Sequence, residues 1–237
     1  MTNKPGVWFG ALLLALGVAA AGWTVGDGLQ RFKLADRSVT IKGLAEADVE
    51  SDFAAWNLTF RRAGNAFADV QQALAEDRSR VMRFLEAAGF TAEELEIRPL
   101  QVQDAYSREY GASNQPLRYT GSGLIIVQSD RVALVEATAL AIDPLIEAGV
   151  EIEGGSGPRY QLRGFNEIKP ALLAEATRNA REQAEKFAAE AGARVGALRT
   201  ANQGVIRITG SDGNDWDDGS SRVKRLRVVS TFEYTLE

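Results

Sequence analysis

The chain has 237 residues, of which 45% are hydrophobic and 25% charged, a balance typical of a folded globular protein. Its 27 basic and 32 acidic residues give a net charge of −5, and no long run of Lys or Arg is present, which disfavours nucleic-acid binding. The chain has neither cysteine nor histidine, which excludes disulfides, His-dependent triads and zinc sites built on those ligands. The composition does not exclude catalysis by a serine–lysine pair or by two carboxylates, or a metal site with oxygen ligands only.

The N-terminal segment from Pro5 to Gly26 contains no charged residue and is about as long as a helix that crosses a bilayer. Trp8 and Trp23 lie near its two ends, where indole rings favour the lipid headgroup region. These features predict a transmembrane anchor within residues 1–30.

A cleavable signal peptide is the alternative interpretation of the same segment. Lys4 supplies a positive start, Leu12–Leu16 an apolar centre and Ala19–Ala21 a run of small residues suited to cleavage. The apolar run continues to Val25, which favours retention. Either way the following residues are exported. For a Gram-negative cell we expect them in the periplasm, tethered to the inner membrane by one helix or soluble after cleavage.

Two strands are predicted after this segment, over Ser38–Leu44 and Phe53–Arg61, because apolar and polar residues alternate in both. We expect the two strands to pair with each other in antiparallel fashion. Apolar residues then recur every three or four positions from Phe67 to Ala88, which predicts an amphipathic helix packed against a sheet. Gly89 follows as a left-handed C-terminal cap.

A long hairpin is predicted next, with strands over Leu95–Tyr106 and Leu117–Ser129 joined by a polar connection. A shorter helix follows from Val132 to Ile142, and we expect Asp143-Pro144 to interrupt it. These elements would add a further hairpin and a short helical connection to the sheet.

The last third of the chain is predicted to contain a broken strand, a second long helix and two closing strands. A strand over Val150–Phe165 is expected to break at Gly154–Pro158, and a second long helix carries apolar residues, many of them alanine, from Leu173 to Ala191. Gly192 ends this helix. Two closing strands are predicted over Val195–Thr209 and Arg222–Leu236.

This order of elements predicts an α+β fold rather than a parallel doubly wound sheet. We expect antiparallel sheets packed against two long amphipathic helices and a shorter one, after an N-terminal transmembrane helix. Residues 38–237 are expected to form one domain.

Several short motifs occur in a fixed order over this range, namely Val39-Thr40-Ile41-Lys42-Gly43, Phe84-Leu85-Glu86-Ala87-Ala88-Gly89-Phe90, Leu95-Glu96-Ile97-Arg98-Pro99-Leu100, Tyr119-Thr120-Gly121 and Ala184-Glu185-Lys186. In order and spacing they resemble the SIMPL-domain family, which includes bacterial periplasmic immunogenic proteins. The chain departs from the family pattern where an early Gly-x-Gly is Gly43-Leu44-Ala45 and where a Pro-Asp is Ser51-Asp52. The resemblance implies an exported envelope protein, linked to stress responses and self-association, without an established enzymatic activity or catalytic residue.

The leading functional hypothesis is a membrane-tethered envelope protein that acts through protein contacts, as a homo-oligomer or with another envelope protein. This hypothesis assigns no catalytic residue, cofactor or metal ligand. A periplasmic module that binds a small ligand or an ion is the alternative, and a hydrolase that uses carboxylates is a third hypothesis.

The candidate binding segments are one acidic loop and one glycine-rich loop. The acidic loop carries oxygen ligands of the kind that calcium prefers, at Asp212, Asn214, Asp215, Asp217 and Asp218. Their spacing does not match an EF-hand loop, so we expect a solvated turn. Gly154–Pro158 lacks the lysine and the following helix of a phosphate-binding loop, which predicts a turn or bulge there as well.

The candidate catalytic residues are carboxylates and serines. The densest set of carboxylates outside the acidic loop is Glu93, Glu94 and Glu96. Glycosidases use carboxylates in facing pairs, but here a helix end meets a strand start, where solvated charge is expected. Ser122 and Ser156 lie between glycines, yet no histidine exists to activate them. Trp56, on an alternating strand, is expected in the core rather than as a ligand platform.

Overall fold

The computed structural model describes residues 14–26, 37–107, 116–155, 157–214 and 216–237. The chain divides into two compact units, each assembled from separate stretches of sequence. The first unit combines the described residues up to Ala45 with Ala171–Ile206 and Val228–Glu237, and the second combines Glu46–Pro170 with Arg207–Arg227. Each unit has its own hydrophobic cluster.

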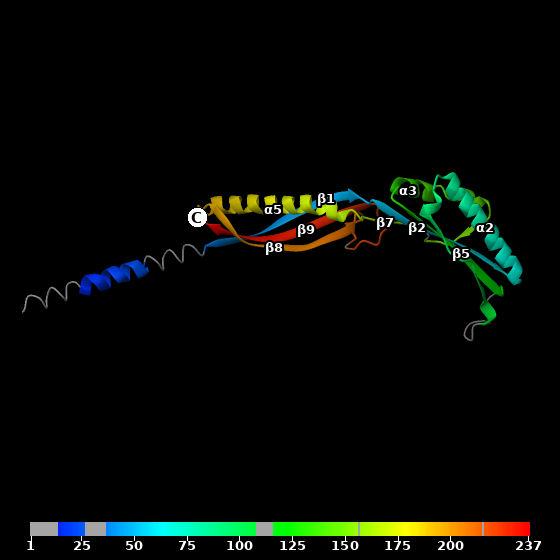
Figure 1. Cartoon of the computed structure of the whole chain (residues 1–237), viewed down its shortest axis with the longest axis horizontal. Helices are drawn as coiled ribbons and strands as arrows, with labels where there is room; N and C mark the ends of the chain where they lie inside the picture. Colours follow the sequence, from blue (N-terminus) through cyan, green and yellow to red (C-terminus); the bar gives the residue numbers. More distant parts are fainter. Residues whose placement is uncertain (1–13, 27–36, 108–115, 156, 215) are drawn as a thin grey trace, which may run out of the picture. The chain divides into compact units, whose positions relative to one another are not determined.

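The sheet of the first unit has three strands in the order β1, β9, β8. Their bounds are Ser38–Glu50 for β1, Val223–Leu236 for β9 and Val195–Gly210 for β8. Arg194 and Glu237 exchange both backbone N–H···O bonds, at 2.8 and 2.9 Å, which is the pattern of antiparallel neighbours. Helix α5, Phe165–Glu190, runs alongside these strands (Figure 1).

Helix α5 packs on the sheet through a stripe of small side chains. Its buried residues recur every four positions, at Leu172, Ala176, Ala180, Ala184 and Ala188. Of these, Ala180 and Ala184 join the apolar side chains of Val39, Phe232 and Tyr234 in one cluster. Alanine at these positions lets the helix backbone lie close to the strands, as the sequence predicts.

The closest approach is at Gly43 of β1. A Cβ atom at this position would lie 2.0 Å from the carbonyl oxygen of Ala176 and 2.8 Å from the Cβ of Ala180. The neighbouring backbone N–H of Leu44 donates to Oδ1 of Asn179 at 3.2 Å. The contact between helix and sheet therefore requires glycine at this place.

The second unit is built on a six-stranded sheet in the order β3, β5, β2, β6, with β4 also paired to β5 and β7 to β2. The bounds are Phe53–Gly64 for β2, Leu95–Ile97 for β3, Gln101–Asp104 for β4, Tyr119–Ser129 for β5, Glu151–Ile152 for β6 and Pro158–Gln161 for β7. The ladders are antiparallel, and in the central one Leu58 lies opposite Ile125.

Helices α2 (Phe67–Ala87), α3 (Val132–Leu140) and α4 (Asp143–Glu147) accompany this sheet (Figure 1). Two 3-10 turns, Ala92–Glu94 and Ala105–Ser107, flank the strands β3 and β4. The apolar side chains that α2 buries are Val70, Leu74, Val81 and Leu85. They join the strand side chains Leu58, Phe60, Ile125 and Val127 in one core, where each buried side chain contributes about 2 kcal/mol.

One ion-pair cluster around a buried carboxylate connects strand β2, the middle of α2 and the end of α4. Asp77 of α2 is fully buried and accepts hydrogen bonds from the guanidinium of Arg62 at 2.5 and 2.8 Å. Arg80 donates to the same carboxylate at 2.9 Å. Arg62 also donates to the carbonyl oxygen of Gly149, after α4, at 2.6 Å. The buried charge is thus neutralised and fully hydrogen-bonded, which its burial requires.

The predicted α+β class and antiparallel sheets are confirmed. Helices α2, α3 and α5, the break between α3 and α4, and strands β8 and β9 all occur where the sequence predicts them. Gly89 has a positive φ of 99°, as expected for a helix cap.

The expected pairing of the first two strands is wrong, because β1 and β2 belong to different sheets. Ser51 and Asp52 connect them, and their backbone N–H groups donate in different directions. The N–H of Ser51 bonds to the carbonyl oxygen of Arg222, and that of Asp52 to Gln161. The two residues therefore pass the chain from one sheet to the next instead of closing a hairpin.

Two other strand predictions need correction. The strand predicted over Leu95–Tyr106 is divided into β3 and β4, because Pro99 has no backbone N–H to donate. Ile97 pairs with Ile125 and Gln101 pairs with Ser122. Three residues separate Ile97 from Gln101, but only two separate Ser122 from Ile125, so one residue of the first strand forms a bulge.

The strand predicted to run to Phe165 ends earlier, since Phe165 is the first residue of α5. The carboxylate of Asp52 accepts the backbone N–H groups of Arg163 at 2.7 Å and Gly164 at 2.5 Å. These two N–H groups precede the helix, so an acidic side chain from a distant part of the chain satisfies its start.

The predicted membrane segment is only partly within the described residues. Residues 14–26 are helical and exposed, whereas the earlier part of Pro5–Gly26 lies outside the described range. No helix among the described residues is long and apolar enough to cross a membrane.

We expect Gly43→Ala to destabilise the protein by about 3 kcal/mol, because the new methyl group would overlap the backbone of α5. Urea unfolding followed by circular dichroism measures the change. Gly154→Ala is the matched control, since a Cβ there meets no atom within 4 Å. Equal stability of Gly43→Ala and the wild type would contradict the close packing of α5 on β1.

Candidate functional site

The first candidate site is the free edge of β8. This strand has 16 residues and lies at the end of the order β1, β9, β8, so one of its edges pairs with β9. Along the described chain no strand pairs with its other edge. Residues 197–203 are exposed without interruption, so side chains on both faces of the strand reach solvent there.

The sequence of this edge lacks the usual protection against pairing. From Thr200 to Ile206 there is neither a charged residue nor a proline, and Val205 is 83% exposed. The opposite edge strand, β1, instead carries the exposed charges Lys42, Glu46, Asp48 and Glu50. Natural sheets protect their edges with charges and prolines of this kind, so β8 is open to pairing with another strand.

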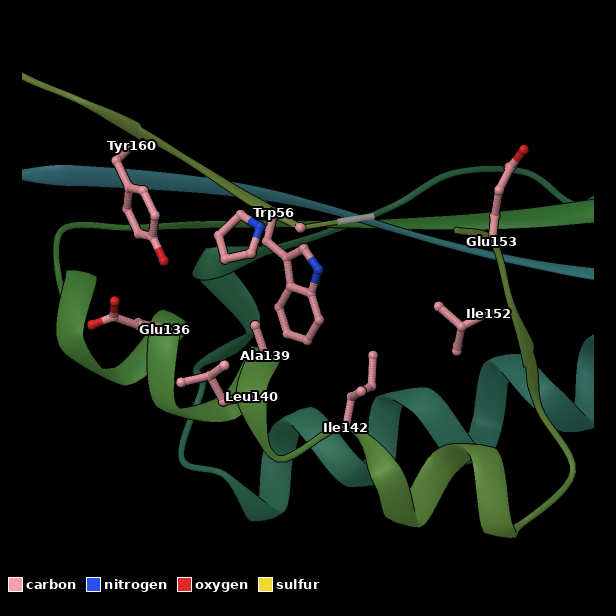
Figure 2. A pocket seen from close by; sticks show the side chains of 10 residues that line it. Trp56, Glu136, Ala139, Leu140, Ile142, Ile152, Glu153 and Tyr160 are labelled. Carbon is pink, nitrogen blue, oxygen red and sulfur yellow. The ribbon is translucent and has the colours of Figure 1, made fainter. Parts of the chain in front are cut away.

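The second candidate site is a cavity of about 370 Å³ in the second unit (Figure 2). Its apolar lining comes from four separate stretches of the chain and consists of Trp56, Ala139, Leu140, Ile142, Ile152 and Pro158. Glu136, Glu153, Gly157 and Tyr160 complete it. The sequence identifies Trp56 as a core residue, which is confirmed at 1% exposure, but not its role as a cavity wall.

The acidic loop uses its carboxylates internally. The side chain of Lys224 is fully buried, and its Nζ donates to Oδ1 of Asp217 at 2.6 Å. Asp218 accepts from the backbone N–H and hydroxyl of Ser220, and Asp212 from Asn214. Asp215 lies outside the described residues. No cluster of acidic residues with metal-binding geometry occurs in the part of the chain that the structure describes.

The three glutamates near the start of β3 do not converge. Glu94 closes a capping box with Thr91, whose backbone N–H donates to it at 2.9 Å. It also accepts from the hydroxyl of Ser129 at 2.5 Å and forms an ion pair with Arg131. Glu96 pairs with Arg98 at 2.8 Å, and Glu93 is exposed. Each carboxylate is therefore occupied locally or solvated, and no two of them face each other.

The environment of Glu94 also fixes its charge. Its side chain is only 15% exposed, and this burial by itself raises the pKa. Hydrogen bonds from Arg131, Ser129 and Thr91 outweigh that effect and lower the pKa from 4.5 to about 2. A carboxyl that stays ionised in this way fits a structural ion pair and not a general acid.

The remaining candidates are structural. Gly154 and Gly155 form the turn between β6 and β7, and the element after them is a strand, which confirms the predicted turn. Ser122 lies within β5, opposite Arg61 of β2. Ser156 lies outside the described residues.

The pKa of Glu94 predicts a pH-dependent contribution to stability. The folded-state pKa is lowered, so the contribution is fully present above the unfolded value of 4.5 and is lost as the pH falls towards about 2. Glu94→Gln should therefore cost about 2 kcal/mol near neutral pH, a value that allows for screening of the half-exposed Arg131, and the difference from wild type should shrink in acid. Urea unfolding across this pH range measures it.

Glu93→Gln serves as the control, because this exposed carboxylate should change stability by less than about 0.5 kcal/mol at any pH. A pH-independent difference between Glu94→Gln and wild type would disprove the ion-pair assignment.

The acidic loop generates a further prediction. Asp217→Asn removes the counter-charge of the buried ammonium of Lys224 and should destabilise the protein by about 3 kcal/mol. Asp212→Asn, an exposed residue that contacts Asn214, should change stability by less than about 0.5 kcal/mol. Addition of calcium should leave the melting temperature unchanged, whereas a rise with calcium would reveal a cation site that the internal pairing argues against.

Comparison with models of protein families identifies the family of this chain. Residues 39–225 match the family described as SIMPL, protein of unknown function (DUF541). The match covers residues of both units, including strands β2 and β8, helices α2 and α5 and all of β1 except Ser38. No curated protein matches the chain. The matched range contains most of the chain, which confirms the resemblance noted in the sequence: the protein belongs to the SIMPL family, whose domain has no assigned function and no known catalytic activity.

Proposed function

We propose that the protein is an envelope protein that acts by self-association, with copies joined through the free edges of their β8 strands. The observation that carries this proposal is the uncharged, proline-free stretch from Thr200 to Ile206 at the edge of a sheet, in which all residues but Gly204 and Ile206 are exposed. An unprotected edge of this length offers a row of backbone N–H and C=O groups to a second strand.

The simplest assembly joins two copies about a two-fold axis. Antiparallel pairing of one β8 with the β8 of a second copy continues the order β1, β9, β8 into a sheet of twice the width. Exposed apolar side chains at Leu198 and Val205 then lie within the new ladder and lose contact with water. Charged residues at both ends of this stretch, Arg199 and Arg207, limit the register that the two strands can adopt.

The envelope location rests on the N-terminal sequence. The uncharged segment Pro5–Gly26 supports export and tethering to the inner membrane, with the family domain in the periplasm. A role in the envelope's response to stress is the biological context that the family resemblance suggests. Catalysis is the weaker hypothesis, since the glutamates that could have formed a facing pair are each bound or solvated within the described residues.

The proposal predicts a defined multimer of the full-length chain. Membranes of expressing cells are extracted with detergent, and intact mass and light scattering give the chain length and the oligomer size. Val205→Lys should convert the multimer to a monomer, because a charge within the uncharged stretch of the edge opposes strand pairing. Leu140→Lys, which changes a residue that is 80% exposed in the second unit, should leave the multimer intact.

Two results would overturn the proposal. A wild-type chain that stays monomeric at high concentration excludes self-association, and a Val205→Lys chain that remains multimeric excludes this edge as the interface. Recovery of a shortened chain in the soluble fraction would replace the tether by a cleaved signal peptide without affecting the test of association.

A further inference from the structure

The cavity of the second unit separates apolar from polar groups. Trp56, Ile142 and Ile152 form its apolar part, and Glu136 and Tyr160 lie together at one end (Figure 2). Glu153 also lines the cavity, but its carboxylate points away from the other side chains (Figure 2). A ligand that fits this arrangement has a hydrocarbon body and one polar end.

Tyr160 places a hydroxyl at the polar end of the cavity. The residue is 7% exposed, and among the described residues its hydroxyl forms no hydrogen bond with a side chain or with the backbone. Solvent reaches this hydroxyl, so water serves as its hydrogen-bonding partner. Since the Tyr160 side chain lines the cavity, a molecule inside the cavity can take the place of that water.

The charge beside this hydroxyl is negative. Glu136 accepts from one guanidinium nitrogen of Arg222 at 2.7 Å, and Glu50 accepts from the other at 2.8 Å. One positive charge is therefore shared by two carboxylates, which leaves the cluster with an excess negative charge. Burial and then the charge of Glu136 raise the pKa of Tyr160, with a smaller opposing effect of Arg222, so the hydroxyl keeps its proton.

Among the described residues that line the cavity there is no lysine or arginine. A carboxylate or phosphate ligand would meet the carboxylate of Glu136 at the polar end, and the guanidinium of Arg222 beside it is already paired with Glu136 and Glu50. A protonated amine can donate to the oxygens of Glu136 and of the Tyr160 hydroxyl, and the faces of Trp56 and Tyr160 favour cations.

We infer that this cavity binds a small apolar primary amine, with its ammonium group at Glu136 and the Tyr160 hydroxyl and its hydrocarbon part against Trp56, Ile142 and Ile152. The volume of about 370 Å³ lies near the lower limit of small-molecule sites, which suits one ring with a short chain. The site belongs to the second unit alone, so it does not depend on association through β8.

Phenylbutylamine, phenylbutanol and phenylbutyrate are matched probes that differ only in the polar end. Isothermal titration calorimetry of the full-length chain in detergent, with empty micelles as the blank, gives the affinity for each. We expect the amine to bind at least tenfold more tightly than the alcohol, and the carboxylate not to bind measurably. Equal affinity for amine and alcohol, or tighter binding of the carboxylate, would overturn the inference.

Two variants locate the binding. Ala139→Phe fills the cavity and should lower the amine affinity at least tenfold, whereas Ala137→Phe, on the exposed side of the same helix, should leave it unchanged. Tyr160→Phe removes only the hydroxyl and should lower the amine affinity about fivefold. This variant keeps the test valid if Ala139→Phe does not fold. Unchanged binding in Tyr160→Phe, or in a folded Ala139→Phe, would place the amine elsewhere.

Discussion

The second unit depends on strand β2, which pairs with other strands along both of its edges. The strand pairs with β5 along one edge and with β6 and β7 along the other, so it is the centre of its sheet. Its alternation places Ala54, Trp56, Leu58 and Phe60 on the buried face, where they hold α2 against the sheet. Because Trp56 is fixed in this way, its indole can also form a rigid wall of the cavity.

Charged side chains in this unit mostly serve the fold. Asp77 draws Arg62 and Arg80 together inside the core, and Asp217 neutralises the buried Lys224. The carboxylate of Glu94 accepts hydrogen bonds from the backbone N–H of Thr91 and the hydroxyl of Ser129, and it forms an ion pair with Arg131. Each of these carboxylates is paired with a basic side chain, as burial of charge requires. At the cavity, Glu136 differs in this respect, because it shares the single guanidinium of Arg222 with Glu50.

The two proposed interactions use different physical features of the same family domain. Association through β8 would draw its affinity from backbone hydrogen bonds along an edge that carries no protecting charge. Binding in the cavity would draw on apolar burial and on one charge-assisted contact. An edge strand in the first unit and a cavity in the second can therefore be tested, and altered, independently.

The sequence by itself determined the positions of the long helices, most strands, the caps and the family, because these follow from periodicity and from local turn chemistry within a few residues. The stripe from Leu172 to Ala188 and the cap at Gly89 are examples. Tertiary structure alone decided that β1 pairs with β9 rather than β2, since the donors at Ser51 and Asp52 find partners more than a hundred residues away. It also decided the cavity, whose walls come from segments that are distant in sequence and that no local pattern connects.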